Sequence, residues 1–236
     1  NSAALRTPGF CKATTGFRLD TSNRQQSLEE TTQIKLLRNM REWNKKRKAM
    51  RHYDRLAPVY DIQYGEEQNA KIEAALNNAK PGENELVLDL GCGTGLLFEQ
   101  IAKSAKLVAG IDISSKILQE AKKRAKRRPN TAILRADADY TPFQNKIFNY
   151  VFAVTLLQNM PNPLKTLQEI KRVSNPQSTV IITGLKKKFS QGRFISLLNE
   201  CGLNVSTLKT NPQLKGHIAI CQNQRTMTAK PQRTHI

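Results

Sequence analysis

Residues 85–97, with the sequence E-L-V-L-D-L-G-C-G-T-G-L-L, decide the fold of this chain. The run Leu86–Leu88 is too short for a helix and is typical of a strand buried on both faces. Three glycines follow at alternate positions, Gly91, Gly93 and Gly95, where a backbone without Cβ atoms can turn sharply and approach a ligand closely. Apolar residues then predict a helix that leaves the turn directly. Strand, glycine turn and helix form the first half-unit of a nucleotide-binding α/β sheet.

The glycine spacing restricts which nucleotide this turn can bind. A dinucleotide fingerprint requires glycine at position 96, where the chain has Leu96, and a phosphate-binding P-loop requires a G-K-[ST] sequence that the turn lacks. The pattern D-x-G-x-G-x-G, which begins at Asp89, does fit. A second acid, Asp112, follows the apolar run of residues 107–111, about 20 residues after the turn, where Rossmann-type sites hold a ribose. A carboxylate there accepts hydrogen bonds from both ribose hydroxyls and repels a 2′-phosphate.

Four motifs in order resemble the class I S-adenosylmethionine-dependent methyltransferase family (methyltransferase type 11-like), over residues 53–221. L-D-L-G-C-G-T-G at 88–95 is similar to the first family motif, and G-I-D-I-S at 110–114 to the second. A-D-A-D-Y-T-P-F at 136–143 resembles the segment after the third strand. F-N-Y-V-F-A-V-T-L-L-Q-N-M at 148–160 resembles the fourth strand and its exit loop. The resemblance implies an α/β fold: a Rossmann-like, seven-stranded, mostly parallel sheet with a C-terminal antiparallel strand and helices on both faces.

The resemblance implies S-adenosyl-L-methionine as the cofactor. It further implies that Asp137 accepts a hydrogen bond from the adenine amino group and that the backbone amide of Ala138 meets a ring nitrogen. The implied cofactor-binding residues are Tyr60, Tyr64, Asp89, Gly91, Cys92, Gly93, Gly95, Asp112, Ile113, Asp137, Ala138 and Thr155.

The segment Y-D-R-L-A-P-V-Y-D-I-Q-Y-G at 53–65 is similar to the Y-D-x-x-A-x-x-Y-D segment of many class I methyltransferases, including quinone C-methyltransferases. By resemblance, Tyr60 and Tyr64 are lid residues over the cofactor. The alternative is that both rings only pack a helix onto the sheet.

The acceptor cannot be read from the residues after the fourth strand. Related enzymes that act on small molecules often carry a histidine at the position of Gln158 or Asn159, so the obvious general base is missing. The sequence N-M-P-N at 159–162 does not match the [DNS]-P-P-[YFW] pattern of exocyclic-amine methylases. The catalytic residue is therefore unknown, with Gln158, Asn159 and Tyr60 as candidates. We expect in-line displacement onto a nitrogen or oxygen, in which the protein contributes mainly positioning.

The net charge of +19 predicts attraction to polyanions and carries no information on the fold. Basic residues gather in three clusters, Lys45–Arg51, Lys122–Arg128 and Lys186–Arg193. RNA is the candidate partner of these clusters, and a solvated surface is the alternative.

Cysteine and histidine usage argues against a metal site. Cys11, Cys92, Cys201 and Cys221 are scattered without a C-x-x-C pair, and the three histidines do not cluster. This usage is typical of a reducing compartment, and we expect a cytoplasmic protein. No apolar stretch approaches the roughly 20 residues that a membrane span needs, so stable membrane insertion is not expected.

Composition and periodicity divide the chain into four parts. We expect a disordered or non-native leader at 1–27, a helical, basic lid segment at 28–64, the methyltransferase domain at 65–222 and a basic tail at 223–236. Three functions remain open: a methyltransferase that acts on RNA or another macromolecule, which the charge favours, a methyltransferase that acts on quinone-type or other small molecules, and a non-catalytic accessory subunit. The intact acids and glycines argue against the third.

Overall fold

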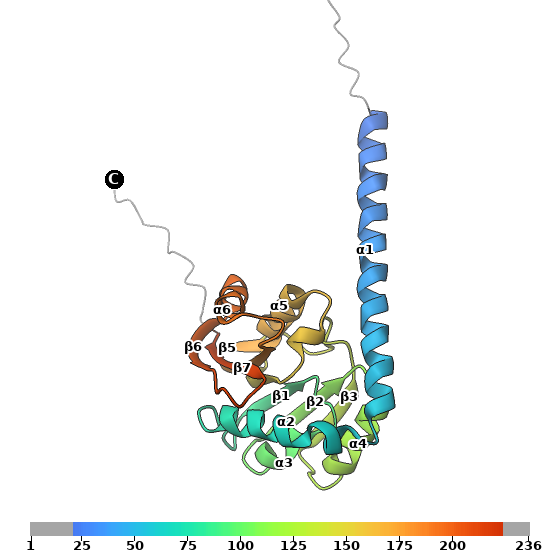
Figure 1. The fold of residues 1–236 in the computed structure, drawn as a ribbon. Helices are drawn as coiled ribbons and strands as arrows, with labels where there is room; N and C mark the ends of the chain where they lie inside the picture. The colour runs from blue at the N-terminus through green and yellow to red at the C-terminus, as the bar shows by residue number, and fades with distance from the viewer. Residues whose placement is uncertain (1–20, 224–236) are drawn as a thin grey trace, which may run out of the picture. The chain divides into compact units, whose positions relative to one another are not determined.

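The computed structural model describes the backbone of residues 21–223 and the side chains of residues 31–223. Within these residues the strands form one seven-stranded sheet in the order β3-β2-β1-β4-β5-β7-β6 (Figure 1). The strands are β1 (Leu86–Leu90), β2 (Leu107–Asp112), β3 (Thr131–Arg135), β4 (Phe148–Ala153), β5 (Ser174–Leu185), β6 (Asn204–Lys209) and β7 (Gly216–Gln222).

Strands β1 to β5 pair in parallel, and β7 runs antiparallel to both of its neighbours, β5 and β6. The predicted fold class is therefore confirmed. The helices are α1 (Thr21–Leu56), α2 (Tyr60–Leu76), α3 (Leu96–Ile101), α4 (Ser115–Ala125), α5 (Pro163–Val173) and α6 (Gln191–Glu200), with a short 3-10 helix, η1 (Leu157–Asn159).

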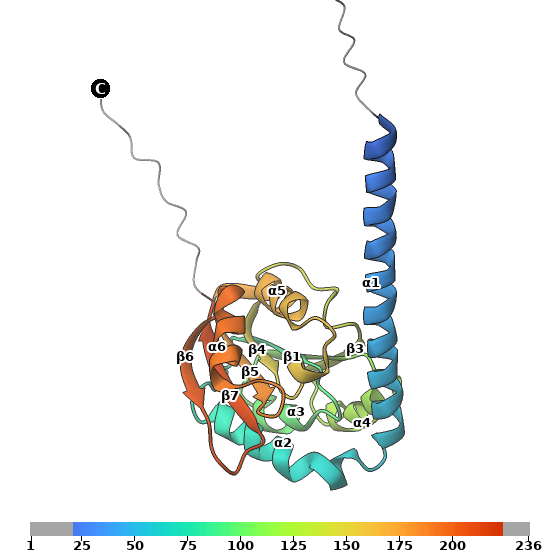
Figure 2. The ribbon, with the colours of Figure 1, turned by 45° about the horizontal axis from the view of Figure 1, so that its top comes forward.

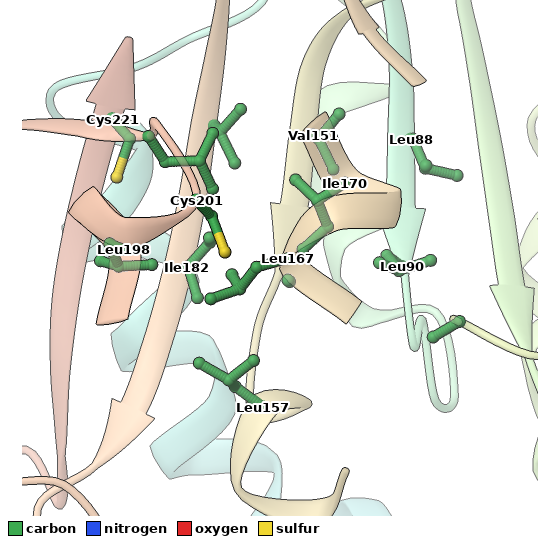
Figure 3. Packing of buried hydrophobic residues seen from close by; sticks show 14 of the residues in the cluster. Leu88, Leu90, Val151, Leu157, Leu167, Ile170, Ile182, Leu198, Cys201 and Cys221 are labelled. Atoms are coloured by element: carbon green, nitrogen blue, oxygen red, sulfur yellow. The ribbon is translucent and has the colours of Figure 1, made fainter. Parts of the chain in front are cut away.

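Alternate side chains of each strand enter two separate cores, one on each face of the sheet. Leu88 and Val151 belong to a core that also contains residues of α5 and α6; in Figure 3, Ile170 of α5 lies beside Val151, and Leu198 of α6 lies beside Ile182 of β5. The neighbours of Leu88 and Val151 in the sequence, including Val87, pack on the opposite face with residues of α2, α3 and α4. Figure 2 shows the two groups of helices on opposite sides of the strands. Both faces are covered, which explains why β1 reads as a continuous apolar run.

Helix α1 starts earlier than the sequence predicts. Residues 21–27, assigned above to a disordered leader, are helical. The rest of that leader and residues 224–236 of the predicted tail lie outside the described residues. Helix α2 starts at Tyr60, so the predicted lid segment already contains its first turn. No helix within residues 21–223 combines the length and the hydropathy that a membrane span requires.

The chain divides into two compact units after Arg41, within α1. In the first unit, the apolar side chains of α1 that have a described environment are exposed, from 52% for Leu37 to 67% for Ile34. The second unit contains the end of α1, the whole sheet and every residue of the predicted site.

Gly110 in β2 has no room for a larger side chain. A Cβ atom there would overlap the ring of the fully buried Phe98, with Cε1 at 2.8 Å. We expect Gly110→Ala to lower the free energy of unfolding by about 1–3 kcal/mol, as overpacked cores do. Denaturant-induced unfolding measures the change. The control is Gly192→Ala in α6, where a Cβ meets no atom within 4 Å and alanine favours the helix. An equal midpoint for Gly110→Ala and the unsubstituted chain would contradict this packing.

Candidate functional site

The carboxyl ends of β1 to β4 and the helices beside them line a pocket that opens to solvent. The pocket lies where the strand order reverses, because the chain continues from β1 to β2 on one side and returns to β4 on the other. Open α/β sheets bind ligands at this position. Helix α1 contributes Lys46, Ala49 and Tyr53 to the lining.

The glycine loop forms the floor of the pocket. Gly91 and Gly93 have φ angles of 76° and 54°, in the left-handed region that side chains with a Cβ rarely adopt. The backbone amides of Gly91 and Cys92 donate to the carbonyl of Ile111 at 2.8 and 2.9 Å, which ties the loop to the end of β2. A Cβ atom on Gly93 would meet nothing within 4 Å, so the space above this residue is open.

Asp112 is held by backbone amides from two loops. Its Oδ2 accepts from the amide of Gly93 at 3.2 Å, and its Oδ1 accepts from the amide of Ser114 at 2.9 Å. Burial raises the pKa of Asp112, although these amides oppose the rise. Each carboxylate oxygen can accept one further hydrogen bond. The carboxylate can therefore bind a ligand with two hydroxyl groups without releasing the loop.

Asp89 lies in a second hollow, under the glycine loop, together with Cys92 and Gln68. Burial, with the charge of Asp112 as a second cause, raises the pKa of Asp89 to about 8. Burial likewise raises the pKa of the Cys92 thiol. The thiol is therefore protonated at neutral pH, as expected for a buried packing residue.

Lys46 binds two carboxylates at the end of β3. Its ammonium donates to both oxygens of Asp137, at 2.7 and 2.8 Å, and to Asp139 at 2.5 Å. Asp139 is buried and also accepts from the hydroxyl of Thr166 at 2.6 Å. Lys46 itself is only 7% exposed. Its assignment to a polyanion-binding cluster is therefore wrong, because its charge is used inside the protein.

The two Y-D pairs of the segment at 53–65 make the same two kinds of contact with the pocket. The rings of Tyr53 and Tyr60 both line the pocket, with centroids 6.0 Å apart. Asp54 accepts from the hydroxyl of Ser114 at 2.5 Å, and Ser114 in turn caps the N-terminus of α4, where its hydroxyl accepts from the amide of Ile117. Asp61 accepts from the hydroxyl of Thr94 at 2.6 Å. Each tyrosine therefore faces the pocket, while the aspartate beside it fastens the segment to a pocket loop.

Arg124 strengthens the second of these attachments. Its guanidinium donates to Asp61 at 2.7 Å and to the carbonyl of Thr94 at 2.9 Å. Arg124 also belongs to a predicted basic cluster, as does Lys123, which pairs with Glu120 at 2.6 Å. Part of the charge of that cluster is therefore neutralised within the fold.

Thr155, at the end of β4, adopts a strained backbone conformation. Its φ is 60°, which is unusual for a β-branched residue. Its amide donates to the hydroxyl of Thr183 at 2.7 Å, and its own hydroxyl donates to Gln68 at 2.7 Å and accepts from Lys71 at 3.2 Å. Such strain persists when neighbours hold a residue in place, and it is commonest at functional sites.

The catalytic candidates after β4 are engaged in hydrogen bonds. The side-chain amides of Gln158 and Asn159 both donate to the carbonyl of Thr155, at 2.8 and 2.9 Å. Asn159 also donates to the hydroxyl of Tyr53 at 2.8 Å. Burial raises the pKa of Tyr60, so this phenol stays protonated at neutral pH and cannot act as an anionic base. Within the described residues, no group of three His, Cys, Asp or Glu side chains is arranged to hold a metal ion.

The structure brings most of the predicted site residues together. Those that line the main pocket are Tyr60, Gly91, Gly93, Asp112, Ile113, Asp137, Ala138, Thr155 and Asn159. Asp89 and Cys92 line the adjoining hollow.

Three predicted residues line neither space. The Tyr64 ring lies 5.2 Å from that of Tyr60 and is 37% exposed, Gly95 immediately precedes α3 as its N-cap, and Gln158 contacts the exit loop. Sequence reasoning missed Tyr53, although the Y-D pair at 53–54 repeats seven residues later.

The raised pKa of Asp89 predicts a pH dependence of stability. An aspartate with a pKa of 3.8 when unfolded and about 8 when folded gives stability that is complete below the lower value and lost as the pH rises toward the upper one. We expect Asp89→Asn to flatten the decline of the free energy of unfolding between pH 5 and roughly 8. Denaturant titrations across this range measure the slope, with Glu83→Gln at an exposed carboxylate as the control. A slope like that of the unsubstituted chain would show that Asp89 is ionised when folded.

Comparison with known proteins shows which proteins this chain is similar to. Residues 88–182 match the family model described as a methyltransferase domain. A 2-phytyl-1,4-naphtoquinone methyltransferase of Nostoc sp. is 32% identical over 59% of this chain and 65% of its own length. A malonyl-[acyl-carrier protein] O-methyltransferase of Marinomonas sp. is 30% identical over 60% of this chain and 53% of its own length. The chain thus spans about half to two thirds of the length of these curated relatives.

Solved structures agree on the fold. A chain from the complex between the Haloferax volcanii Trm112 methyltransferase activator and a methyltransferase superposes with a TM-score of 0.66 at 16% identity, over 73% of this chain and 98% of that one. A SAM-dependent methyltransferase from Aquifex aeolicus gives a TM-score of 0.58 at 20% identity, over 64% of this chain and 88% of that one. Residues 88–182 are thus similar to a methyltransferase domain, and the sheet order and the glycine loop agree with the class I, S-adenosylmethionine-dependent type that the sequence motifs resemble.

Proposed function

We propose that the protein is a methyltransferase that binds S-adenosylmethionine in the main pocket and methylates a nitrogen or oxygen of an RNA acceptor. The observation that carries the cofactor assignment is the half-buried Asp112 carboxylate, which is fixed by the amides of Gly93 and Ser114 beside a glycine floor with open space. A ribose diol needs two acceptor oxygens at such a position. When bound, the cofactor supplies an electrophilic methyl group on a sulfonium.

The adenine end of the pocket also fits this cofactor. Asp137 follows β3 and offers a carboxylate to an exocyclic amine, and the backbone amide of Ala138 is a donor to a ring nitrogen. Lys46 contacts both oxygens of Asp137, and Oδ1 also accepts from the backbone amide of Asp139 at 3.0 Å, but Oδ2 has a second lone pair, so the carboxylate can accept from Lys46 and from an amine together. Lys46 would thereby orient the group that selects adenine.

Residues near the acceptor position contribute positioning rather than proton abstraction. The amides of Gln158 and Asn159 are held by the Thr155 carbonyl, and Tyr60 stays protonated. The rings of Tyr53 and Tyr60 line this end of the pocket. An amine or ring nitrogen suits such a site, since it needs at most modest proton removal. Proximity in a dry pocket can supply several kcal/mol of the barrier reduction.

The acceptor class is supported by charge. With a net charge of +19, the chain attracts polyanions, and RNA supplies both the negative charge and nitrogen or oxygen acceptors. A second candidate, a quinone-type small molecule, is favoured by the naphtoquinone methyltransferase relative and by the tyrosine-rich wall of the pocket.

The role of Asp112 is tested by removing its carboxylate. We expect Asp112→Ala to abolish measurable S-adenosylmethionine binding in calorimetry, a loss of at least about a hundredfold, since two ribose hydrogen bonds to a charged group disappear. Circular dichroism should show an unchanged fold. Cofactor affinity equal to that of the unsubstituted chain would remove Asp112 from the site.

The acceptor class is tested with purified protein and methyl-labelled S-adenosylmethionine, offered separately to RNA, protein and metabolite fractions of the host cell. Label in RNA, absent with Asp112→Ala, is the expected result. Label confined to the metabolite fraction would favour the quinone-type candidate instead. Cofactor binding without transfer to any fraction would reject an enzymatic function in favour of an accessory subunit.

A further inference from the structure

The last turns of α1, from residue 42 to Leu56, have two chemically different faces. Lys46, Ala49 and Tyr53 point inward and line the cofactor pocket. The opposite face is exposed. Its exposed residues are Trp43, Asn44, Lys45, Arg47, Lys48, Arg51, His52 and Arg55, which include five cations and no acid.

Four of these exposed residues form one stripe. Trp43, Arg47, Arg51 and Arg55 follow each other at intervals of four residues, so their side chains lie on the same side of the helix. Successive members are separated by about 6 Å along the axis, at roughly 1.5 Å per residue. An aromatic ring is thus aligned with three guanidinium groups in regular succession.

The arginine stripe borders a groove. Asn44, Arg47, Lys48, Arg51, Asp54, Arg55 and Lys116 line it. The side chains of Lys48, Arg51 and Arg55 have no hydrogen-bond or ion-pair partner among the residues that the structure describes. Asp54 is the acid in the groove, and its Oδ1 already accepts from the hydroxyl of Ser114 and the amide of Lys116, at 2.5 and 3.1 Å. The groove therefore carries an excess of unpaired positive charge.

The chemistry of this face favours a single-stranded nucleic acid. Guanidinium groups bind phosphates through two parallel hydrogen bonds, and an exposed indole offers a surface on which a base can stack. An anionic membrane would need an apolar face beside the cations. Between residue 42 and Leu56 the exposed large apolar side chain is Trp43 alone, and the exposed apolar residues of α1 at positions 34–40 lie before the stripe.

We propose that the Trp43–Arg55 stripe and its groove bind single-stranded RNA, with phosphates on Arg47, Arg51 and Arg55 and a base stacked on Trp43. The proposal rests on the proposed function, in which RNA carries the methyl acceptor. Lys46 and Tyr53, on the inner face of the same turns, form a wall of the cofactor pocket. A strand held on the outer face is thereby kept next to the site of transfer.

Trp43 provides a direct probe, because it is the single tryptophan of the chain. We expect a single-stranded RNA oligonucleotide to quench its fluorescence, whereas inorganic polyphosphate should bind without quenching because it has charge but no bases. RNA binding that leaves the fluorescence unchanged would overturn the stacking contact. A response to phosphatidylglycerol vesicles but not to RNA would overturn the RNA assignment in favour of a membrane surface.

The arginines are tested by the combined variant Arg47→Ala, Arg51→Ala and Arg55→Ala. Fluorescence anisotropy of labelled RNA should show at least tenfold weaker binding at low salt, and the slope of log K against log salt should fall by about 2, at roughly 0.7 for each phosphate that is no longer neutralised. The charge-matched control replaces Lys80, Lys103 and Lys106 with alanine. These lysines are exposed and precede β1 or β2, at the opposite edge of the sheet from the pocket. Equally weakened RNA binding in both triple variants would show that only the net charge of the protein matters and would overturn the proposal that the groove binds RNA.

Label transfer separates this proposal from the proposed function. If the unsubstituted protein methylates RNA and the arginine variant does so with unchanged kcat/KM, the proposal that the groove binds RNA is wrong and the proposed function stands. If RNA binds through the arginines and quenches Trp43 but receives no label, the groove stands and RNA methylation is wrong. Cofactor affinity of the arginine variant, measured by calorimetry, should be unchanged.

Discussion

A hydrogen bond from the backbone amide of Gly93 to the carboxylate of Asp112 joins the loop after β1 to the end of β2, and the pocket depends on it. The amides of Gly91 and Cys92, which donate to the Ile111 carbonyl, make the same connection through the main chain. The backbone makes these contacts with positive φ angles at Gly91 and Gly93, so glycine is favoured at both positions. The conformation of the glycine loop therefore both leaves open space above Gly93 and holds the carboxylate of Asp112 in place.

The segment at 53–65, which contains the end of α1 and the start of α2, completes the pocket with two tyrosine–aspartate pairs. Asp54 and Asp61 attach it to the loop after β2 and to the glycine loop, and the tyrosine that precedes each aspartate faces the ligand space. Arg124 joins the second attachment from the far end of α4. Hydrogen bonds that involve charged groups are stronger than neutral ones, so the carboxylates of Asp54 and Asp61 hold this segment firmly against the pocket loops.

Much of the fold could be predicted from the sequence, because the signals are local. The strand β1, the glycine turn and the acid that ends β2 lie close together in the sequence and obey fixed spacings. The part of the site that joins distant segments could not be predicted. Lys46 stands in a uniform run of cations, yet its partners Asp137 and Asp139 follow 91 and 93 residues later.

Other long-range contacts have the same character. Asn159 donates to the hydroxyl of Tyr53, which lies 106 residues earlier in the sequence. Thr155 adopts a positive φ that the residues around it in the sequence do not predict. Gln68, Lys71 and Thr183, from other elements, hold Thr155 in this conformation through hydrogen bonds. Helical phase does explain afterwards why Lys46 and Arg47 differ: adjacent residues of a helix point about 100° apart, so one can be buried while the next is exposed.

The adjacency of Lys46 and Arg47 has a thermodynamic consequence. The inner residue is bonded to Asp137, at the end of the pocket proposed for adenine, and the outer one belongs to the exposed stripe proposed for RNA, so a single helical turn faces both proposed binding surfaces. A ligand that orders this turn from one side lowers the entropy that a ligand on the other side must lose. The two occupancies are then linked, and by reciprocity each raises the affinity for the other by the same factor.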